Sequence, residues 1–319
     1  MPKIAIAQLA PVFLDRTACI NIAVDAIQQA SGEGASLIVF PEAFITGYPA
    51  WIWRLRPGLD HAACTLLHKE LVTAASRVTS DDLSALFQAA KTHNITVVCG
   101  VQELDSEGSQ TSLYNTVICI DNEGLLRNKH RKLIPTNAER MIWAQGDGSG
   151  LKVVDSDSGK LGTLICWENY MPLARYALYA QGLEVYIAPT YDSGEMWITS
   201  MRHIARESGC WVISANNAFK ASDLGHTILS ATDAYPDPNE WVNPGDSVVI
   251  APGGEIAAGP WRNQQGIFYA DLDLSMVINA RRSLDVAGHY ARRDLFRLEV
   301  NTEQEDTVTF TATQKTKGS

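Results

Sequence analysis

The chain has no CxxC pair and no cysteine–histidine spacing of the zinc-binding kind. This absence argues against a disulfide framework and against a structural metal site. Two of the thiols, Cys99 and Cys119, lie inside apolar, strand-like runs, where a small buried thiol is the usual state. The six cysteines are widely separated, at Cys19, Cys64, Cys99, Cys119, Cys166 and Cys210.

Long apolar stretches are also absent from the sequence. No run approaches the roughly 18 residues that suggest a membrane span. The apolar run within residues 1–8 is too short and begins too early for a secretory signal peptide. We therefore expect no membrane partner and a cytoplasmic protein with reduced thiols.

Positive charge is scarce relative to negative charge. The chain has 26 Lys+Arg against 36 Asp+Glu, which gives a formal net charge of −10 at pH 7. A nucleic-acid-binding protein usually shows a basic face or stripe, so this balance argues against nucleic acid as a partner. One dense basic cluster runs from Arg127 to Lys132, and taken alone it is typical of a solvated strand end.

Short β-branched runs alternate with helical periodicity along most of the chain. Turn residues at 122–124 and 157–159 predict two β-hairpins. Crossovers mixed with hairpins favour a mixed sheet, or two packed sheets between helical layers, over a purely doubly wound topology. The expected strands are 4–8, 37–40, 95–101, 114–121, 125–129, 151–154, 162–166, 185–188, 211–215, 248–251 and 266–273, and the expected helices are 17–30, 82–93, 172–181 and 195–207.

The domain organisation predicted from the sequence is simple. Length alone does not decide between one large domain and two, but no interdomain linker and no internal repeat is visible in the sequence. We therefore expect one domain over residues 1–300. Residues 301–319 are polar and threonine-rich, which is typical of an extended or disordered tail.

Three chemically active side chains each follow a predicted strand. Glu42 follows the run 36–41, Lys132 closes the basic run 129–132, and Cys166 ends the apolar run 164–165. Side chains just past the carboxyl ends of strands converge on a shared crevice in an open α/β sheet, so these three can meet. A carboxylate that moves protons, a cation that stabilises negative charge and a nucleophilic sulfur together suit covalent catalysis.

The sequence blocks around these residues carry a family resemblance. Pro41-Glu42-Ala43-Phe44 and Cys166-Trp167-Glu168-Asn169 flank a middle block made of His130-Arg131-Lys132-Leu133, Pro135-Thr136 and Glu139-Arg140. In this order they resemble the three signature blocks of the carbon–nitrogen hydrolase superfamily, and most of all its nitrilase branch. The resemblance runs from about Lys3 to about Val300, and three ordered blocks are far more specific than one short motif. It implies a four-layer α-β-β-α sandwich.

The resemblance also implies a role for each residue. Cys166 is the expected nucleophile, Glu42 the proton acceptor and Lys132 the proton donor and oxyanion stabiliser. Glu139 is the expected supporting carboxylate; its alternative is an exposed surface charge. A free thiol has a pKa of about 8.5, so the site must either favour the thiolate, through Lys132, or remove the proton during attack, through Glu42.

The implied reaction hydrolyses an organic nitrile to a carboxylic acid and ammonia through a thioimidate and then a thioester on Cys166. It requires no metal and no organic cofactor. The backbone N–H of Trp167 is placed like an oxyanion-hole donor. Substrate-binding candidates are the aromatic residues closest to these blocks, for which core packing is an equally good alternative: Tyr48, Trp143, Trp167 and Tyr170.

Alternatives to a nitrilase remain open at this stage. An amidase of the same superfamily would use the same nucleophile, base and lysine, although Trp167-Glu168-Asn169 favours a nitrilase. A cyanide-hydrolysing variant fits the same residues. A non-catalytic scaffold should have lost one of the three catalytic residues, and none is lost. The resemblance further implies a homodimer or a larger homo-oligomer, open spirals included, with the tail either an interface arm or inert.

Overall fold

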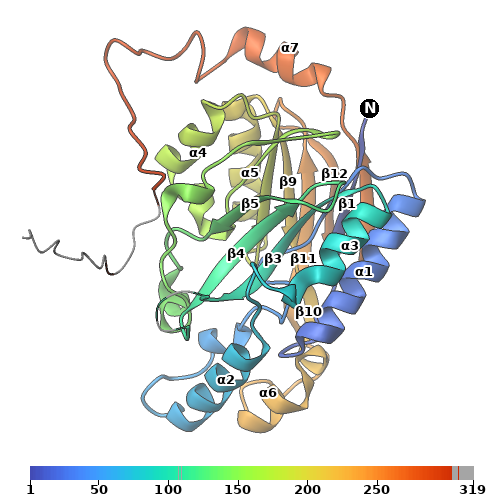
Figure 1. Cartoon of the computed structure of the whole chain (residues 1–319), viewed down its shortest axis with the longest axis vertical. Coiled ribbons are helices and arrows are strands. Elements are labelled where there is room, and N and C mark those ends of the chain that lie inside the picture. The colour runs from blue at the N-terminus through green and yellow to red at the C-terminus, as the bar shows by residue number, and fades with distance from the viewer. Residues whose placement is uncertain (107, 109, 304–307, 309–319) are drawn as a thin grey trace, which may run out of the picture.

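Two β-sheets packed face to face form the centre of the computed structural model, which describes residues 1–106, 108, 110–303 and 308 (Figure 1). The first sheet has the order β13-β1-β2-β3-β4-β5, with β1, β2 and β3 parallel and the other pairs antiparallel. Its strands are β1 (Lys3–Gln8), β2 (Leu37–Val39), β3 (Thr96–Leu104), β4 (Leu113–Ile120), β5 (Leu126–Arg131) and β13 (Gly266–Asp271).

The second sheet repeats this plan of parallel strands flanked by antiparallel ones. Its order is β10-β11-β9-β8-β7-β6, with β12 paired to β11, and β7, β8 and β9 are parallel. Its strands are β6 (Val154–Ser156), β7 (Gly159–Thr163), β8 (Val185–Thr190), β9 (Trp211–Asn216), β10 (Ala218–Lys220), β11 (Trp241–Ile250) and β12 (Ile256–Arg262).

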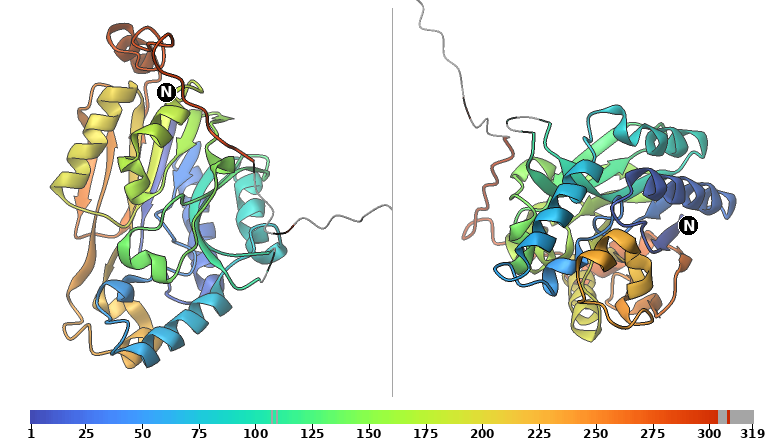
Figure 2. Two further views of the ribbon diagram at one scale, coloured as in Figure 1. Left: turned by 90° about the vertical axis from the view of Figure 1, so that its left-hand side faces the viewer. Right: turned by 90° about the horizontal axis from the view of Figure 1, so that it is seen from below.

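Alternation along the strands builds the layers. In β1, Ile4 and Ile6 face the second sheet and join a core shared by both sheets, whereas Ala5 and Ala7 face the helices α1 (Arg16–Gly32) and α3 (Ser84–Thr92). In β8, Tyr186 instead faces the outer helices α4 (Pro172–Tyr179) and α5 (Glu195–Ser208). The order from outside to outside is helices, sheet, sheet, helices (Figure 2). The expected four-layer sandwich is confirmed.

Further helices close the two ends of the sandwich. α2 (His61–Ala74) and α6 (Gly225–Ala231) lie together at the lower end of Figure 1, and α7 (Ser275–Ser283) lies at the upper end. None of these three helices was predicted. The short 3-10 helices are η1 (Ala50–Trp53), η2 (Asp81–Leu83), η3 (Asn137–Met141), η4 (Gly148–Gly150), η5 (Cys166–Tyr170) and η6 (Ala221–Leu224).

The second predicted hairpin is present, but its boundaries were wrong. The pair 151–154 and 162–166 becomes β6 and β7, so residues 151–153 lie outside any strand and β7 ends before Cys166. Gln181 explains the first difference, because its side chain accepts from the Val153 N–H and donates to the Leu151 carbonyl. The backbone polar groups there are satisfied by a side chain and do not need a neighbouring strand.

The other predicted elements agree with the structure within a few residues, with two exceptions: β11 begins at Trp241, well before the expected 248–251, and the helix expected at 82–93 is split into η2 and α3. The strands β10 and β12 were not predicted. Among the described helices, none is long and apolar enough to cross a membrane. The predicted polar tail, 301–319, lies outside the described residues apart from 301–303 and 308. The boundary at residue 300 therefore stays a prediction.

Candidate active site

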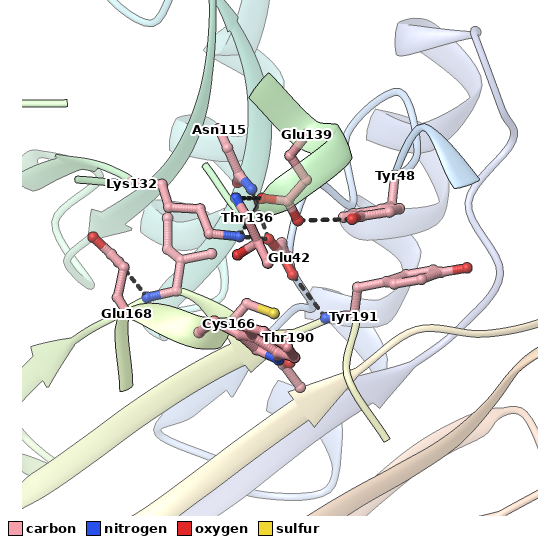
Figure 3. Close-up of polar contacts among 12 residues, drawn as sticks. Glu42, Tyr48, Asn115, Lys132, Thr136, Glu139, Cys166, Glu168, Thr190 and Tyr191 are labelled. Atoms are coloured by element: carbon pink, nitrogen blue, oxygen red, sulfur yellow. Dashed lines mark hydrogen bonds and ion pairs between the residues drawn. The ribbon is translucent and has the colours of Figure 1, made fainter. Parts of the chain in front are cut away.

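The three predicted catalytic side chains converge at one end of the sandwich (Figure 3). Glu42 lies in the turn after β2, Lys132 directly follows β5, and Cys166 begins η5 after β7. Gly100 in β3 allows the Glu42 turn to pack closely, because a Cβ atom there would lie 2.2 Å from the Pro41 carbonyl oxygen. The expectation that side chains just past the carboxyl ends of strands meet therefore agrees with the positions of these three residues.

Lys132 bridges two carboxylates. Its Nζ lies 2.8 Å from Glu42 Oε1 and 2.7 Å from Glu139 Oε2. All three side chains are almost completely buried. Because isolated charges are costly to bury, each member of this cluster depends on the others and on further hydrogen bonds.

Glu42 receives hydrogen bonds from both sheets. The Asn115 side-chain amide, in β4, donates to Oε1 at 2.6 Å, and the backbone N–H of Tyr191, just after β8, donates to Oε2 at 2.7 Å. Burial raises the pKa of Glu42 to about 6, although the adjacent charge of Lys132 acts to lower it. A carboxylate with this pKa is ionised at neutral pH and is a stronger base than an exposed one.

Glu139 is held in η3 by its own capping interaction and by an aromatic residue. The Thr136 N–H donates to Oε2 at 2.6 Å, and the Tyr48 hydroxyl donates to Oε1 at 2.7 Å. The Tyr48 hydroxyl in turn accepts from the indole N–H of Trp53 at 3.0 Å. Glu139 is therefore a buried, oriented carboxylate beside Lys132 and not an exposed surface charge.

Cys166 occupies a strained turn. Its φ of +50° is in the left-handed region, which few non-glycine residues adopt. Burial raises the pKa of the Cys166 thiol, the negative charge of Glu42 raises it further, and Lys132 and the Thr190 side chain lower it without offsetting these effects. The resting group is a thiol. Of the two expected routes, removal of the proton during attack therefore agrees with the site.

Glu168 holds the Cys166 turn against the Lys132 segment. Its carboxylate accepts from the Ile165 N–H at 2.6 Å, from the Leu133 N–H at 2.5 Å and from His130 Nε2 at 3.0 Å. The residues before Cys166 and after Lys132 are thus fixed to one buried side chain. This role was not predicted from the sequence, although Glu168 lies within the quoted Cys166 block.

A cavity of about 260 Å³ lies beside Cys166. Of the four predicted substrate-binding residues, Tyr48 and Trp167 lie in its wall. Trp143 lies behind Tyr48, edge-on to its ring, and donates its indole N–H to Gln102 at 2.6 Å. Tyr170 lies outside the wall, half-exposed, with its hydroxyl near Ser200. The wall is formed by Tyr48, Trp53, Thr136, Glu139, Cys166, Trp167, Tyr191, Asp192, Ser193, Val242 and Asn243.

Trp143 and Tyr170 were predicted to bind substrate because they are close in sequence to the catalytic blocks. In the structure, neither residue lies in the cavity wall. Sequence reasoning also missed Asn115, Thr190, Tyr191 and Asp192. Thr190 ends β8, and Tyr191 and Asp192 directly follow it, so the reasoning from strand ends that selected Lys132 would have selected them too. Among the described residues, no group of three or more His, Cys, Asp or Glu side chains could hold a metal ion.

Sequence comparison identifies the same family along nearly the whole chain. The carbon-nitrogen hydrolase family model matches residues 3–282. Nitrilase 2 of Arabidopsis thaliana is 40% identical over 312 residues, which cover 97% of this chain and 91% of that protein. Bifunctional nitrilase/nitrile hydratase NIT4 of Oryza sativa subsp. japonica is 40% identical over 323 residues, which cover 98% and 88% of the two chains.

Solved structures share the fold at low sequence identity. Saccharomyces cerevisiae Nit3, a member of branch 10 of the nitrilase superfamily, aligns with a TM-score of 0.70 at 22% identity over 92% of this chain and 97% of that one. The amidase from Nesterenkonia sp. aligns with a TM-score of 0.64 at 22% identity over 88% and 94%. With the matching family model and the nearly full-length relatives, these findings show that the chain belongs to the carbon–nitrogen hydrolase family.

Proposed function

We propose that this protein is a nitrilase that hydrolyses small organic nitriles to carboxylic acids and ammonia. The observation that carries the proposal is the cluster of Glu42, Lys132 and Cys166 at one place, with Cys166 in the wall of a cavity. The identity of about 40% with curated nitrilases over nearly the whole chain supports a nitrile as substrate in preference to an amide. The amidase likeness lies at 22% identity and concerns the fold.

In the first covalent stage, the sulfur of Cys166 attacks the nitrile carbon while Glu42 accepts the thiol proton. A C–S bond forms, and one π pair of the C≡N bond moves to nitrogen. The nitrogen takes a proton from protonated Glu42, or from Lys132 that Glu42 then reprotonates, which gives a neutral thioimidate and leaves Glu42 ionised and Lys132 charged. The Lys132 ammonium and the Trp167 backbone N–H supply the electrostatic stabilisation of the developing negative charge.

In the second stage, the oxygen of a water molecule bonds to the thioimidate carbon while Glu42 takes a proton from that water. The nitrogen receives this proton from Glu42 and then, as the C–N bond breaks, the proton of the new hydroxyl group, so that ammonia leaves and a thioester remains. A second water, again deprotonated by Glu42, attacks the thioester, and cleavage of the C–S bond releases the acid and restores the Cys166 thiol. Glu139 supports this cycle by holding Lys132 in place.

A minor nitrile hydratase activity is a second candidate, because several relatives carry both activities in their names. The two outcomes diverge at the tetrahedral intermediate formed by the first water. Cleavage of its C–N bond leads to acid, whereas cleavage of its C–S bond releases an amide. Protonation of nitrogen by the Glu42–Lys132 pair favours loss of ammonia, so the acid is the expected main product.

A product assay tests the proposal. Aliphatic, aromatic and arylaceto nitriles, with acetamide and cyanide beside them, should be incubated with the enzyme, and acid, amide and ammonia measured. The expected result is equimolar acid and ammonia from at least one organic nitrile. Release of ammonia from acetamide alone would make the protein an amidase, and turnover of cyanide alone would make it a cyanide hydrolase.

The chain is also proposed to assemble as a homodimer or larger homo-oligomer. Large exposed apolar side chains in the first turns of α4 and α5 support this, since Leu173 and Met196 are 66% and 77% exposed in the single chain. Light scattering over a concentration series should give a mass of at least two chains. A mass of one chain at every concentration would contradict this part of the proposal.

A further inference from the structure

The cavity wall carries an uncompensated negative charge. Its described lining residues include two carboxylates, Glu139 and Asp192, and no lysine, arginine or histidine. We infer that Asp192 determines charge specificity: the site accepts neutral or cationic aryl nitriles and discriminates against nitriles that carry a carboxylate. This inference rests on the proposed nitrilase function and names its substrate class.

Asp192 is held firmly in the wall. Its Oδ2 accepts the indole N–H of Trp167 at 2.8 Å, and its Oδ1 accepts the Ser193 N–H at 2.8 Å. Its backbone N–H donates to Thr190 Oγ1, and its carbonyl accepts from the Asn216 side-chain amide. The carboxylate therefore has a defined position beside the side chain that follows the nucleophile.

The charge of Asp192 differs from the other charges of the site. Glu42 and Glu139 each lie within 2.8 Å of the Lys132 ammonium and share it as an ion-pair partner. The partners of Asp192 are neutral donors, and no ion pair joins it to a cation among the described residues. An uncompensated carboxylate at the wall of a partly desolvated cavity repels an anionic substrate and attracts a cationic one.

The remaining wall favours an aryl group. Tyr48 stacks on Tyr191 with ring centroids 3.8 Å apart, and Trp53 and Trp167 complete the aromatic lining. Aromatic faces stabilise both aryl rings and cations placed over them. The predicted substrate is thus a nitrile with an aryl group that is neutral or bears an ammonium.

Three matched substrates test the inference: phenylacetonitrile, 4-(cyanomethyl)benzoate and 4-(aminomethyl)phenylacetonitrile. Ammonia release gives kcat/KM for each. Wild type should turn over the carboxylate substrate least efficiently. Asp192→Asn keeps an oxygen acceptor for Trp167 but removes the charge, so the carboxylate-to-neutral ratio of kcat/KM should rise about tenfold and the ammonium-to-neutral ratio should fall.

Asp233→Asn is the matched control, because Asp233 is an exposed carboxylate outside this cavity and its loss changes the total charge equally. Its ratios should equal those of wild type. Should Asp192→Asn not fold, raising the salt concentration with wild type should narrow the discrimination against the carboxylate substrate.

Two outcomes are distinguishable from one another. The inference is overturned, while the nitrilase function stands, by either of two results. One is an Asp192→Asn enzyme that turns over phenylacetonitrile and keeps the wild-type carboxylate-to-neutral and ammonium-to-neutral ratios of kcat/KM. The other is a wild type that prefers the carboxylate substrate at low salt. If wild type releases no ammonia from any of the three nitriles or from those of the wider panel, the proposed function is overturned and the inference with it.

Discussion

The inner site and the rim of the cavity are built on different principles. The inner site, made of Glu42, Lys132, Glu139 and Cys166, is at most 4% exposed at any residue. The rim is made of Trp53, Trp167 and Asp192, and its two tryptophans are 44% and 50% exposed. Buried charges fixed by several hydrogen bonds are preorganised for chemistry, whereas partly exposed side chains at a cavity rim are accessible to a ligand.

This difference predicts a gradient of mutational effects. Changes in the inner site should reduce kcat by orders of magnitude, because they remove interactions that act on the transition state. Changes at the rim should act mainly through KM. The following predictions, in order of decreasing effect, are designed to test that gradient.

Replacing the nucleophile should have the largest effect. Cys166→Ala should lower kcat by about 10⁴-fold or more, because no covalent intermediate can form. Its melting temperature should remain close to that of wild type. Cys99→Ala, at a completely buried thiol in β3, is the control: it should lose roughly 1 kcal/mol of stability and retain kcat. Activity of Cys166→Ala within tenfold of wild type would refute the covalent mechanism.

Glu42→Gln should follow, with kcat/KM reduced about 10²- to 10⁴-fold, since the amide keeps the shape but is not a base. Mass spectrometry of this variant should detect a covalent adduct on Cys166 that wild type clears. A Glu42→Gln enzyme with near-normal acid release would assign the base to Glu139 instead.

The pH profile of wild type checks the same assignment. The raised pKa of Glu42, about 6, means that the base becomes protonated as the pH falls through that value. We therefore expect kcat/KM to be on a plateau near neutral pH and to fall about tenfold per pH unit well below 6. A plateau that persists to pH 5 would contradict the assignment of Glu42.

Glu168→Gln should have an intermediate effect, because Glu168 positions the Cys166 turn and is not among the described residues that form the cavity wall. Loss of its charge weakens buried hydrogen bonds to Ile165, Leu133 and His130 and should cost roughly 1–3 kcal/mol of stability. We expect kcat to fall about tenfold with little change in KM.

Glu103→Gln is the matched control for that variant. Glu103 is another buried carboxylate, paired with Lys129 and Arg131, and it makes no contact with the Cys166 turn. Both variants should melt earlier, but only Glu168→Gln should lose most of its kcat. If Glu168→Gln and Glu103→Gln lost kcat equally, Glu168 would contribute only to stability and not to the position of Cys166.

Trp53→Phe should have the smallest effect. The substitution removes a half-exposed indole from the rim and one hydrogen bond to Tyr48. We expect KM for aryl nitriles to rise about threefold, because part of the apolar contact is lost, and kcat to change less than KM. Steady-state kinetics on phenylacetonitrile and on a short aliphatic nitrile would check this. A larger effect on kcat than on KM would contradict the prediction that substitutions at the rim act mainly through KM.

Local pattern was sufficient for most of the fold. Alternating residues such as Ile4 and Ile6 against Ala5 and Ala7 predict strands because side chains on a strand point to opposite faces. α2 was missed although Leu67 and Leu71 are buried on one face. Its apolar face is recognisable only beside α6 and η1, which cover it in the folded chain.

The sequence by itself singled out the groups to which the proposed chemistry is assigned, since Glu42, Lys132, Glu139 and Cys166 were all identified from short blocks. Only the tertiary structure decided how they are tuned. The Tyr191 N–H that orients Glu42 comes from a backbone that every residue has, and Asp192 acquires its place in the wall because the second sheet brings β8 against the first. Burial, which sets the pKa of Glu42 and Cys166, belongs to the packed sandwich and to no segment alone, because desolvation depends on every atom around a charge.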